Sequence, residues 1–238
     1  RGLGDVYKRQ LLIHAQRPDA TACAELELWN QKMSRWVNRG AKGIALLDDT
    51  GPRTKLRYVF DIADTHLVRG GKTPLLWNLD SHEHEQAILD HLADTYGLSQ
   101  TDSMNAALLE LAQQLTADNL DEAMDGLAYE VKDTFLEELD EDNIRVRFRE
   151  LMTNSIFYTL SRRCGQEPMD VLDDDEFIRI VDFNKLPVLS FLGNAVSEQC
   201  EAVLFDIGRE MRKIYKKEIT QQLEKSVDSL YNTNTDFS

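Results

Sequence analysis

The chain has 238 residues, of which 42% are apolar and 29% charged, a composition typical of a globular protein with one large core or two small ones. Its formal net charge of −15 argues against general coating of nucleic acid or of a membrane surface. Its three cysteines are far apart and form no Cys-x-x-Cys pair, which indicates neither a disulfide framework nor a zinc knuckle. No apolar run approaches the roughly 20 residues that span a bilayer. We therefore expect a cytoplasmic protein with buried thiols and no membrane partner.

The pattern of residues changes along the chain and predicts four regions. Residues 1–20 are an N-terminal tail, and residues 1–10 (RGLGDVYKRQ) resemble translated sequencing-adapter sequence, so they are left out of the fold prediction. Residues 21–80 are predicted to be a basic module of one helix and a β-hairpin, and residues 81–225 an acidic helical domain. The polar residues 226–238 are predicted to form a disordered tail.

The basic module is predicted to begin with an amphipathic helix over residues 22–39. Apolar side chains recur there at helical spacing from Leu26 onward and include Trp29 and Trp36, which favours a core position for both tryptophans. Gly40 is expected to end this helix in the left-handed region of backbone conformation.

A β-hairpin is predicted after this helix. Its strands are residues 43–48 and 56–62, and the segment DDTGPRTK (48–55) between them has the Gly, Pro and Asp residues of a turn. Alternation along the second strand puts Arg57 and Asp61 on one face. The apolar side chains of the other face are Leu56, Tyr58, Phe60 and Ile62.

This module is the only basic segment that counting charges along the chain reveals. Between residues 30 and 72, nine cations stand against four anions, a net charge of +5, so the other residues carry −20. Such a split predicts one anion-binding surface on a body that repels anions. The cations expected to bind phosphate without reading bases are Lys32, Arg35, Arg39, Lys42, Lys55 and Arg57. An alternative is that Trp29 and Trp36 stack on bases beside Lys32 and Arg39.

From residue 81 onward the sequence predicts helices. Their ranges are 81–96, 101–116, 120–138, 141–163, 173–181 and, beginning at Pro187, 187 to about 225. Gly97 and Gly165 suit helix ends, and Asp140 suits an N-cap. The long apolar stripe of the last helix predicts that it is buried against the helices of residues 81–163.

Three local patterns resemble functional motifs, but each lacks a required feature. The segment LVRGGKT (67–73) has His66 where a phosphate-binding loop needs its first glycine. The histidines of SHEHEQAILDH (81–91) do not have the His-Glu-x-x-His spacing of a zinc protease. The acidic runs 137–142 and 173–176 lack the spacing of a calcium loop. We therefore predict no catalytic residue, no cofactor and no metal site.

The segment WNQKMSRWVNRGAKGIALLDD, followed by LRYVFDIADT, resembles the N-terminal region of very large proteins of bacterial conjugative elements. Those proteins carry helicase or DNA-methylase modules further along the chain. The resemblance continues through FLEELDEDNIRVRFRELMTNSIFYTLSRRCG and FNKLPVLSFLGNA, so it covers most of the chain from about Leu11.

Residues 29–65 are also similar, more weakly, to the N-terminal domain of ArdC-type antirestriction proteins. That similarity implies binding of single-stranded DNA through a small α/β module. The zinc-ligand motif of the metalloprotease-like domain that follows in that family is absent here, so only the DNA-binding half of the similarity carries over.

We expect an α+β, mostly helical protein with the helix and hairpin module packed on a helical bundle. The function expected is that of a non-enzymatic module of a mobile-element DNA-processing protein, which binds the nucleic-acid backbone. Its expected partners are DNA, in single-stranded form, and downstream domains of a longer parent protein. Two alternatives remain: a scaffold that docks other domains of a long chain, and an acidic mimic of DNA with antirestriction activity. A continuous positive groove would favour the first function, and scattered cations the scaffold.

Overall fold

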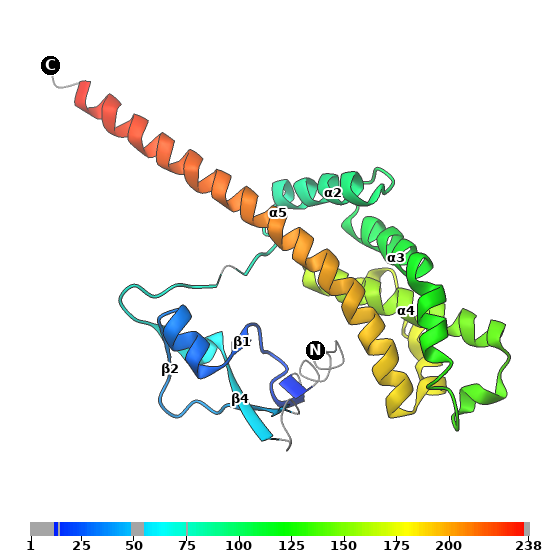
Figure 1. The fold of residues 1–238 in the computed structure, drawn as a ribbon. Helices are drawn as coiled ribbons and strands as arrows, with labels where there is room; N and C mark the ends of the chain where they lie inside the picture. Colours follow the sequence, from blue (N-terminus) through cyan, green and yellow to red (C-terminus); the bar gives the residue numbers. More distant parts are fainter. Residues whose placement is uncertain (1–11, 14, 49–54, 75, 236–238) are drawn as a thin grey trace. The chain divides into compact units, whose positions relative to one another are not determined.

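The structure is a computed structural model, which describes residues 12–13, 15–48, 55–74 and 76–235. The chain divides into two compact units, Arg1–Leu76 and Trp77–Ser238, called here the N-terminal unit and the C-terminal unit. The first contains short strands and the second is helical (Figure 1), so the predicted α+β class is confirmed. None of the described helices has both the length and the apolar content needed to cross a lipid bilayer.

A three-stranded antiparallel sheet forms the frame of the N-terminal unit. Its strands lie in the order β1 (Cys23–Ala24), β4 (Lys55–Asp61) and β3 (Ile44–Asp48). The predicted β-hairpin is thus confirmed as β3 and β4, whereas most of the turn predicted between them lies outside the described residues. A short 3₁₀ turn, η2 (Ile62–Asp64), follows β4.

The hairpin face that carries Leu56, Tyr58 and Phe60, which is the more apolar of the two, is the one exposed to solvent. Ile44, Leu46 and Val59 form a small buried cluster on the opposite face, and Leu56 is 60% exposed. Arg57 lies on the same side as the buried cluster, since it is directly opposite Leu46 in the strand pairing. Polar residues can occupy this face because they have partners there, as described below for Arg57 and Asp61.

The helix predicted over residues 22–39 is wrong for most of its length. Only a short helical segment is present, which includes the π-helical turn η1 (Leu28–Lys32). It is followed by the strand β2 (Arg35–Val37), which pairs antiparallel with β5 (Thr65–Leu67) in a second sheet. Ser34 has a φ angle of 48°, which interrupts the helix between η1 and β2. Gly40 is left-handed, as expected, with φ 89°, but it lies in the turn after β2 and does not end a helix.

The two tryptophans of this segment have opposite environments. Trp29 is 2% exposed, as predicted, and its Nε1 donates a hydrogen bond of 2.8 Å to the carbonyl oxygen of Phe60. Trp36 is 55% exposed, so its predicted core position is wrong. The reason is that Trp36 belongs to a strand, in which neighbouring side chains point to opposite faces, and Arg35 is the buried residue.

In the described part of the C-terminal unit there are four α-helices and three 3₁₀ turns. The α-helices are α2 (His82–Tyr96), α3 (Met104–Leu127), α4 (Glu141–Arg163) and α5 (Leu186–Thr235). The turns are η3 (Phe135–Glu138), η4 (Pro168–Asp170) and η5 (Asp174–Phe183). The side chains of Ser81, Ser103 and Asp140 cap α2, α3 and α4, because each accepts a hydrogen bond from the backbone N–H three residues later.

Four of the predicted helices differ from the structure. Residues 101–116 and 120–138 were expected to be separate, but α3 is continuous through Asn119, whose side chain donates to the Leu115 carbonyl oxygen at 2.7 Å. The segment predicted as a helix at 173–181 is the 3₁₀ turn η5. The helix α5 continues to Thr235, into the region where disorder was predicted, and the Lys, Glu and Gln residues before it are good helix formers.

The N-terminal half of α5 is buried among the other helices, as its apolar stripe predicted. Val188, Leu192, Val203, Ile207 and Met211 all belong to the core of this unit. The helix then continues beyond α2 (Figure 1), where residues 219–225 are all exposed.

Two histidines of α2, His84 and His91, face α5. His84 Nε2 lies 2.8 Å from Glu218 Oε1, and His91 Nε2 lies 2.7 Å from Asp206 Oδ2. These contacts explain the spacing of seven residues between His84 and His91, which puts both on one side of α2. The histidine motif therefore joins α2 to α5.

The packing of Trp77 on Gly208 leads to a first prediction. A Cβ atom at residue 208 would lie 2.7 Å from Trp77 Nε1. The indole cannot easily yield, because the Arg163 guanidinium lies 3.7 Å from its ring centroid and donates to the Trp77 carbonyl oxygen. We expect Gly208→Ala to destabilise the unit by about 1–3 kcal/mol, although alanine favours helix by about 1 kcal/mol.

Urea denaturation followed by far-UV circular dichroism measures this effect. In a Trp77→Ala background the clash is absent, so Gly208→Ala should then stabilise the protein. The same destabilisation in both backgrounds would contradict the assigned contact.

Candidate nucleic-acid interface

Five of the six cations predicted to bind phosphate have side chains that reach solvent. Arg39 and Lys42 are exposed in the turn between β2 and β3, and Lys55 is exposed at the start of β4. Lys32 and Arg57 line one groove. The cations therefore lie at separate places and do not form the continuous positive groove that was considered from the sequence.

The sixth cation, Arg35, is a buried residue that holds strands together. Its Nε donates to Thr65 Oγ1 at 2.7 Å. Its two terminal nitrogens donate to the Thr65 carbonyl oxygen and to Thr73 Oγ1, both at 3.4 Å. These bonds join β2 to β5 and to the segment that follows β5. Because its donors are used inside the unit, we leave Arg35 out of the candidate interface.

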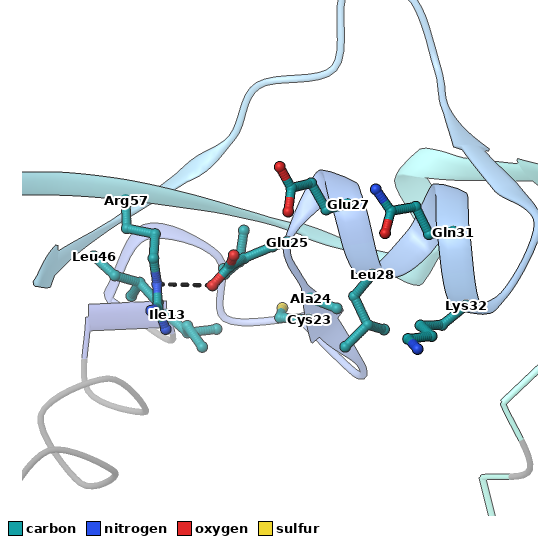
Figure 2. Close-up of a pocket in the computed structure, with 11 residues that line it drawn as sticks. Ile13, Cys23, Ala24, Glu25, Glu27, Leu28, Gln31, Lys32, Leu46 and Arg57 are labelled. Atoms are coloured by element: carbon teal, nitrogen blue, oxygen red, sulfur yellow. Dashed lines mark ion pairs between the residues drawn. The ribbon is translucent and has the colours of Figure 1, made fainter. Parts of the chain in front are cut away.

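A groove of about 470 Å³ lies along η1, β1 and the inner face of the hairpin (Figure 2). Its charged lining residues are Lys32 and Arg57, with Glu25 and Glu27. Arg57 Nε lies 2.9 Å from Glu25 Oε1, the ion pair drawn in Figure 2. Two anions thus balance two cations, so this groove is a poor site for a phosphate chain. Its apolar lining comes from Ile13, Ala24, Leu28, Leu46 and Val59.

The thiol of Cys23, which also lines the groove, is not a nucleophile at neutral pH. Its burial, together with the charge and the hydrogen bond of Asp61, raises the pKa of Cys23 to about 11. Burial also raises the pKa of Cys164 and of Cys200 to about 12. Because only the thiolate is reactive, none of these cysteines suits nucleophilic catalysis.

Asp61 is a carboxylate buried at the end of β4, where it is 1% exposed. Its oxygens accept hydrogen bonds from the backbone N–H groups of Thr21 (2.7 Å), Ala22 (3.0 Å) and Ala63 (2.9 Å). Burial opposes ionisation of Asp61, but these bonds and the charge of Arg17 outweigh it, so the pKa lies below its ordinary value. Asp61 therefore joins the segment before β1 to β4 and is not available to a ligand.

The paired strands β2 and β5, called here the β2–β5 ribbon, present two rings to solvent. Trp36 lies directly opposite His66, so their Cβ atoms share one face at about 5 Å. Both side chains are exposed. His66 Nδ1 also lies 2.6 Å from Asn38 Oδ1. The exposed face of the ribbon thus combines an indole with an imidazole and an amide that can hydrogen-bond.

Exposed cations lie at both ends of this ribbon. Arg39 follows β2 at one end. At the other end the turn after β5 carries Arg69 and Lys72, and the Lys72 N–H donates to the Met33 carbonyl oxygen at 2.7 Å. Lys32 is next to Met33. Among the described residues none forms an ion pair with these four cations.

This ribbon is the part of the candidate interface that the sequence did not reveal. Arg69 and Lys72 were counted in the basic segment but were not selected, and Trp36 was placed in the core. The available signal was the alternation of polar and apolar residues around Trp36, which is too short to identify a three-residue strand.

The turn from residue 67 to 73 is held by backbone hydrogen bonds. The Gly71 N–H donates to the Val68 carbonyl oxygen at 2.7 Å, and Gly70 has a φ angle of 81°. Residues 71–80, apart from Leu75, are neither helix nor strand. The turn therefore lacks the following helix whose N-terminus would hold a phosphate.

Within the described part of the chain, no group of three or more His, Cys, Asp or Glu side chains is arranged to hold a metal ion. Comparisons of the chain with protein-family models, with curated proteins and with solved structures give no match. Two features of the described residues therefore bear on function. They are the exposed aromatic ribbon between cations and the charge-balanced groove.

Proposed function

We propose that the N-terminal unit binds single-stranded nucleic acid on the β2–β5 ribbon, as a non-enzymatic module of a mobile-element DNA-processing protein. The observation that carries this proposal is the exposure of Trp36, 55%, on a ribbon whose end cations form no ion pair with any residue that the structure describes. An exposed indole can stack on any base, and stacking of this kind is independent of sequence. The resemblance of residues 29–65 to a domain associated with single-stranded DNA agrees with this function.

The proposed division of roles follows from the side chains. Trp36 and His66 contact bases, while Lys32, Arg39, Arg69 and Lys72 contact phosphates on either side of them. The acidic remainder of the chain repels the phosphate backbone and so confines it to this unit. Arg35 and Arg57 are omitted from the phosphate contacts, because the first is buried and the second is paired with Glu25.

Salt dependence tests the proposal. With about four phosphate contacts, the slope of log K against log salt should be near −3 for a single strand. Removing two contacts in Arg39→Ala/Lys72→Ala should make this slope less steep by about 1.4. Fluorescence anisotropy of a labelled oligothymidylate measures both values.

A matched control removes two exposed cations from the C-terminal unit, in Lys132→Ala/Lys185→Ala. This variant should keep the wild-type slope, although its net charge changes by the same amount. No binding at low salt, or an equal loss in the control, would rule out the ribbon as the binding surface.

A second candidate function is protein interaction, which the charge-balanced groove and the exposed apolar residues of the C-terminal unit favour. Phe205, Ile219 and Leu223 are exposed on α5, and Ile178 and Val181 on η5. Apolar side chains gathered on exposed elements are typical of surfaces that bind other proteins.

A further inference from the structure

The solvent face of α5 carries a stripe of cations and apolar side chains. Phe205, Arg212 and Ile219 follow one another at intervals of seven residues, which puts them on one side of the helix. The Arg212 guanidinium lies 5.9 Å from the centroid of the Phe205 ring, which agrees with this placement. The opposite side carries Ile207 and Met211, which are fully buried. The exposed residues called here the α5 stripe are Phe205, Arg209, Arg212, Lys213, Lys216, Ile219 and Leu223.

The cations of the α5 stripe are only partly neutralised. Arg209 pairs with Asp206, and Lys213 Nζ lies 2.5 Å from Glu210 Oε2. Arg212 and Lys216 form no ion pair with any residue that the structure describes.

A surface of opposite charge lies where η3 and η5 contact each other. This contact joins η3, which contains Glu137 and Glu138, to η5, which begins within the acidic run 173–176. Exposed apolar side chains accompany the carboxylates. The exposed residues called here the acidic surface are Phe135, Glu137, Glu138, Asp173, Asp175, Ile178 and Val181. Arg179 of η5 is also exposed, and its Nε lies 4.0 Å from Glu150 Oε2.

The α5 stripe and the acidic surface of one molecule cannot reach each other. η5 ends at Phe183 and α5 begins at Leu186, so the acidic surface lies near the N-terminal end of α5. α5 is one unbroken helix, and a rise of about 1.5 Å per residue puts Arg212 about 40 Å from Leu186. A rigid helix of that length keeps the two surfaces apart.

We propose that the α5 stripe of one copy binds the acidic surface of a second copy. The two surfaces match in both charge and apolar content, and a second copy is the one partner that always supplies the complementary surface. A second copy carries the same net charge of −15, so the attraction is confined to these two surfaces. Such a contact joins two different patches, so it closes as a two-fold dimer where both pairs of patches meet reciprocally, and otherwise builds a larger ring or an open chain of copies.

Sedimentation velocity over a range of concentrations and salt tests this contact. The wild-type protein should associate at low salt and dissociate at high salt, because exposed charge pairs are screened. Arg212→Glu/Lys216→Glu should weaken association about tenfold or more, and so should Asp173→Lys/Asp175→Lys, since each opposes like charges. The variant that carries all four substitutions should associate again, because the charges are complementary but exchanged.

A control reversal in the N-terminal unit, Lys42→Glu/Lys55→Glu, changes the net charge as much as the α5 variant and should leave association unchanged. All substituted residues are exposed, and circular dichroism verifies that each variant is folded. The proposal is overturned if the wild-type protein stays monomeric at low salt. It is equally overturned if either reversal has no effect, or if the fourfold variant does not associate.

Discussion

Replacing Trp29 with alanine is expected to unfold much of the N-terminal unit, whereas replacing Trp36 is expected to leave its stability almost unchanged. Trp29 is buried and its indole N–H binds the Phe60 carbonyl oxygen, so its loss removes a large side chain and leaves a buried acceptor unpaired. A buried tryptophan truncated to alanine costs about 3–5 kcal/mol. The unit has a small aliphatic cluster, so this cost is comparable with the 5–15 kcal/mol that stabilises a whole domain.

Trp36 is expected to behave differently because most of its side chain is already in solvent. Substitution at exposed positions changes stability by only about 0.5 kcal/mol. If Trp36 stacks on a base, however, Trp36→Ala should weaken binding of a single strand by about 1–3 kcal/mol. Binding and stability thus respond to different tryptophans.

Hydrogen–deuterium exchange of the β3 and β4 amides distinguishes the two residues. In Trp29→Ala these amides should lose protection, while the amides of α3 and α4 in the C-terminal unit keep theirs. In Trp36→Ala all of them should stay protected, and anisotropy should report weaker binding of the oligonucleotide. Loss of β-sheet protection in Trp36→Ala would place this residue in the core after all. Unchanged binding in that variant would remove base stacking from the proposed function.

The helices of the C-terminal unit were predictable because their signals lie within a few residues of each other. α4 begins and ends where the sequence placed it, and its N-cap Asp140 binds the N–H of Asn143 at 2.9 Å. α2 ends at Gly97, whose φ angle of 69° is the left-handed conformation expected of a helix-ending glycine. In both cases a single residue favours the backbone geometry that is observed at its own position.

The β2–β5 ribbon could not be predicted in the same way, because its stability comes from residues far along the chain. β2 has three residues, too few for alternation to be distinguished from helical spacing. What makes it a strand is β5, together with Thr65 and Thr73, which accept hydrogen bonds from Arg35. An arginine with such partners cannot be recognised from its neighbours in the sequence.

The cations of the candidate interface also could not be identified from the sequence alone. A net charge of +5 between residues 30 and 72 correctly identified a basic segment, but it treated every cation as available. Arg57 is paired with Glu25, which lies outside that segment, and Arg35 is buried. Counting charges therefore predicts whether a surface is positive or negative. It does not predict which residues form that surface.

Replacing Asp61 with asparagine is expected to destabilise the N-terminal unit at neutral pH by about 2–4 kcal/mol. The carboxylate accepts hydrogen bonds from three backbone N–H groups, and an amide in its place has one oxygen and turns an NH₂ group toward at least one of them. A buried backbone N–H group then faces the asparagine NH₂ group, and two donors cannot form a hydrogen bond. Asp19→Asn is a suitable control, since Asp19 is exposed in the same unit and should cost little.

The same carboxylate should make the stability of this unit depend on pH. The pKa of Asp61 is lower in the folded protein than in the unfolded chain. Its stabilising effect is therefore complete above the ordinary aspartate pKa of about 4 and is lost as the pH falls through the lower folded value. Between pH 7 and pH 3, NMR cross-peaks of the β3 and β4 amides in urea should report falling stability for the wild type and a flatter profile for Asp61→Asn. Parallel profiles would mean that other carboxylates control acid unfolding, and that the three backbone hydrogen bonds to Asp61 do not stabilise its ionised form.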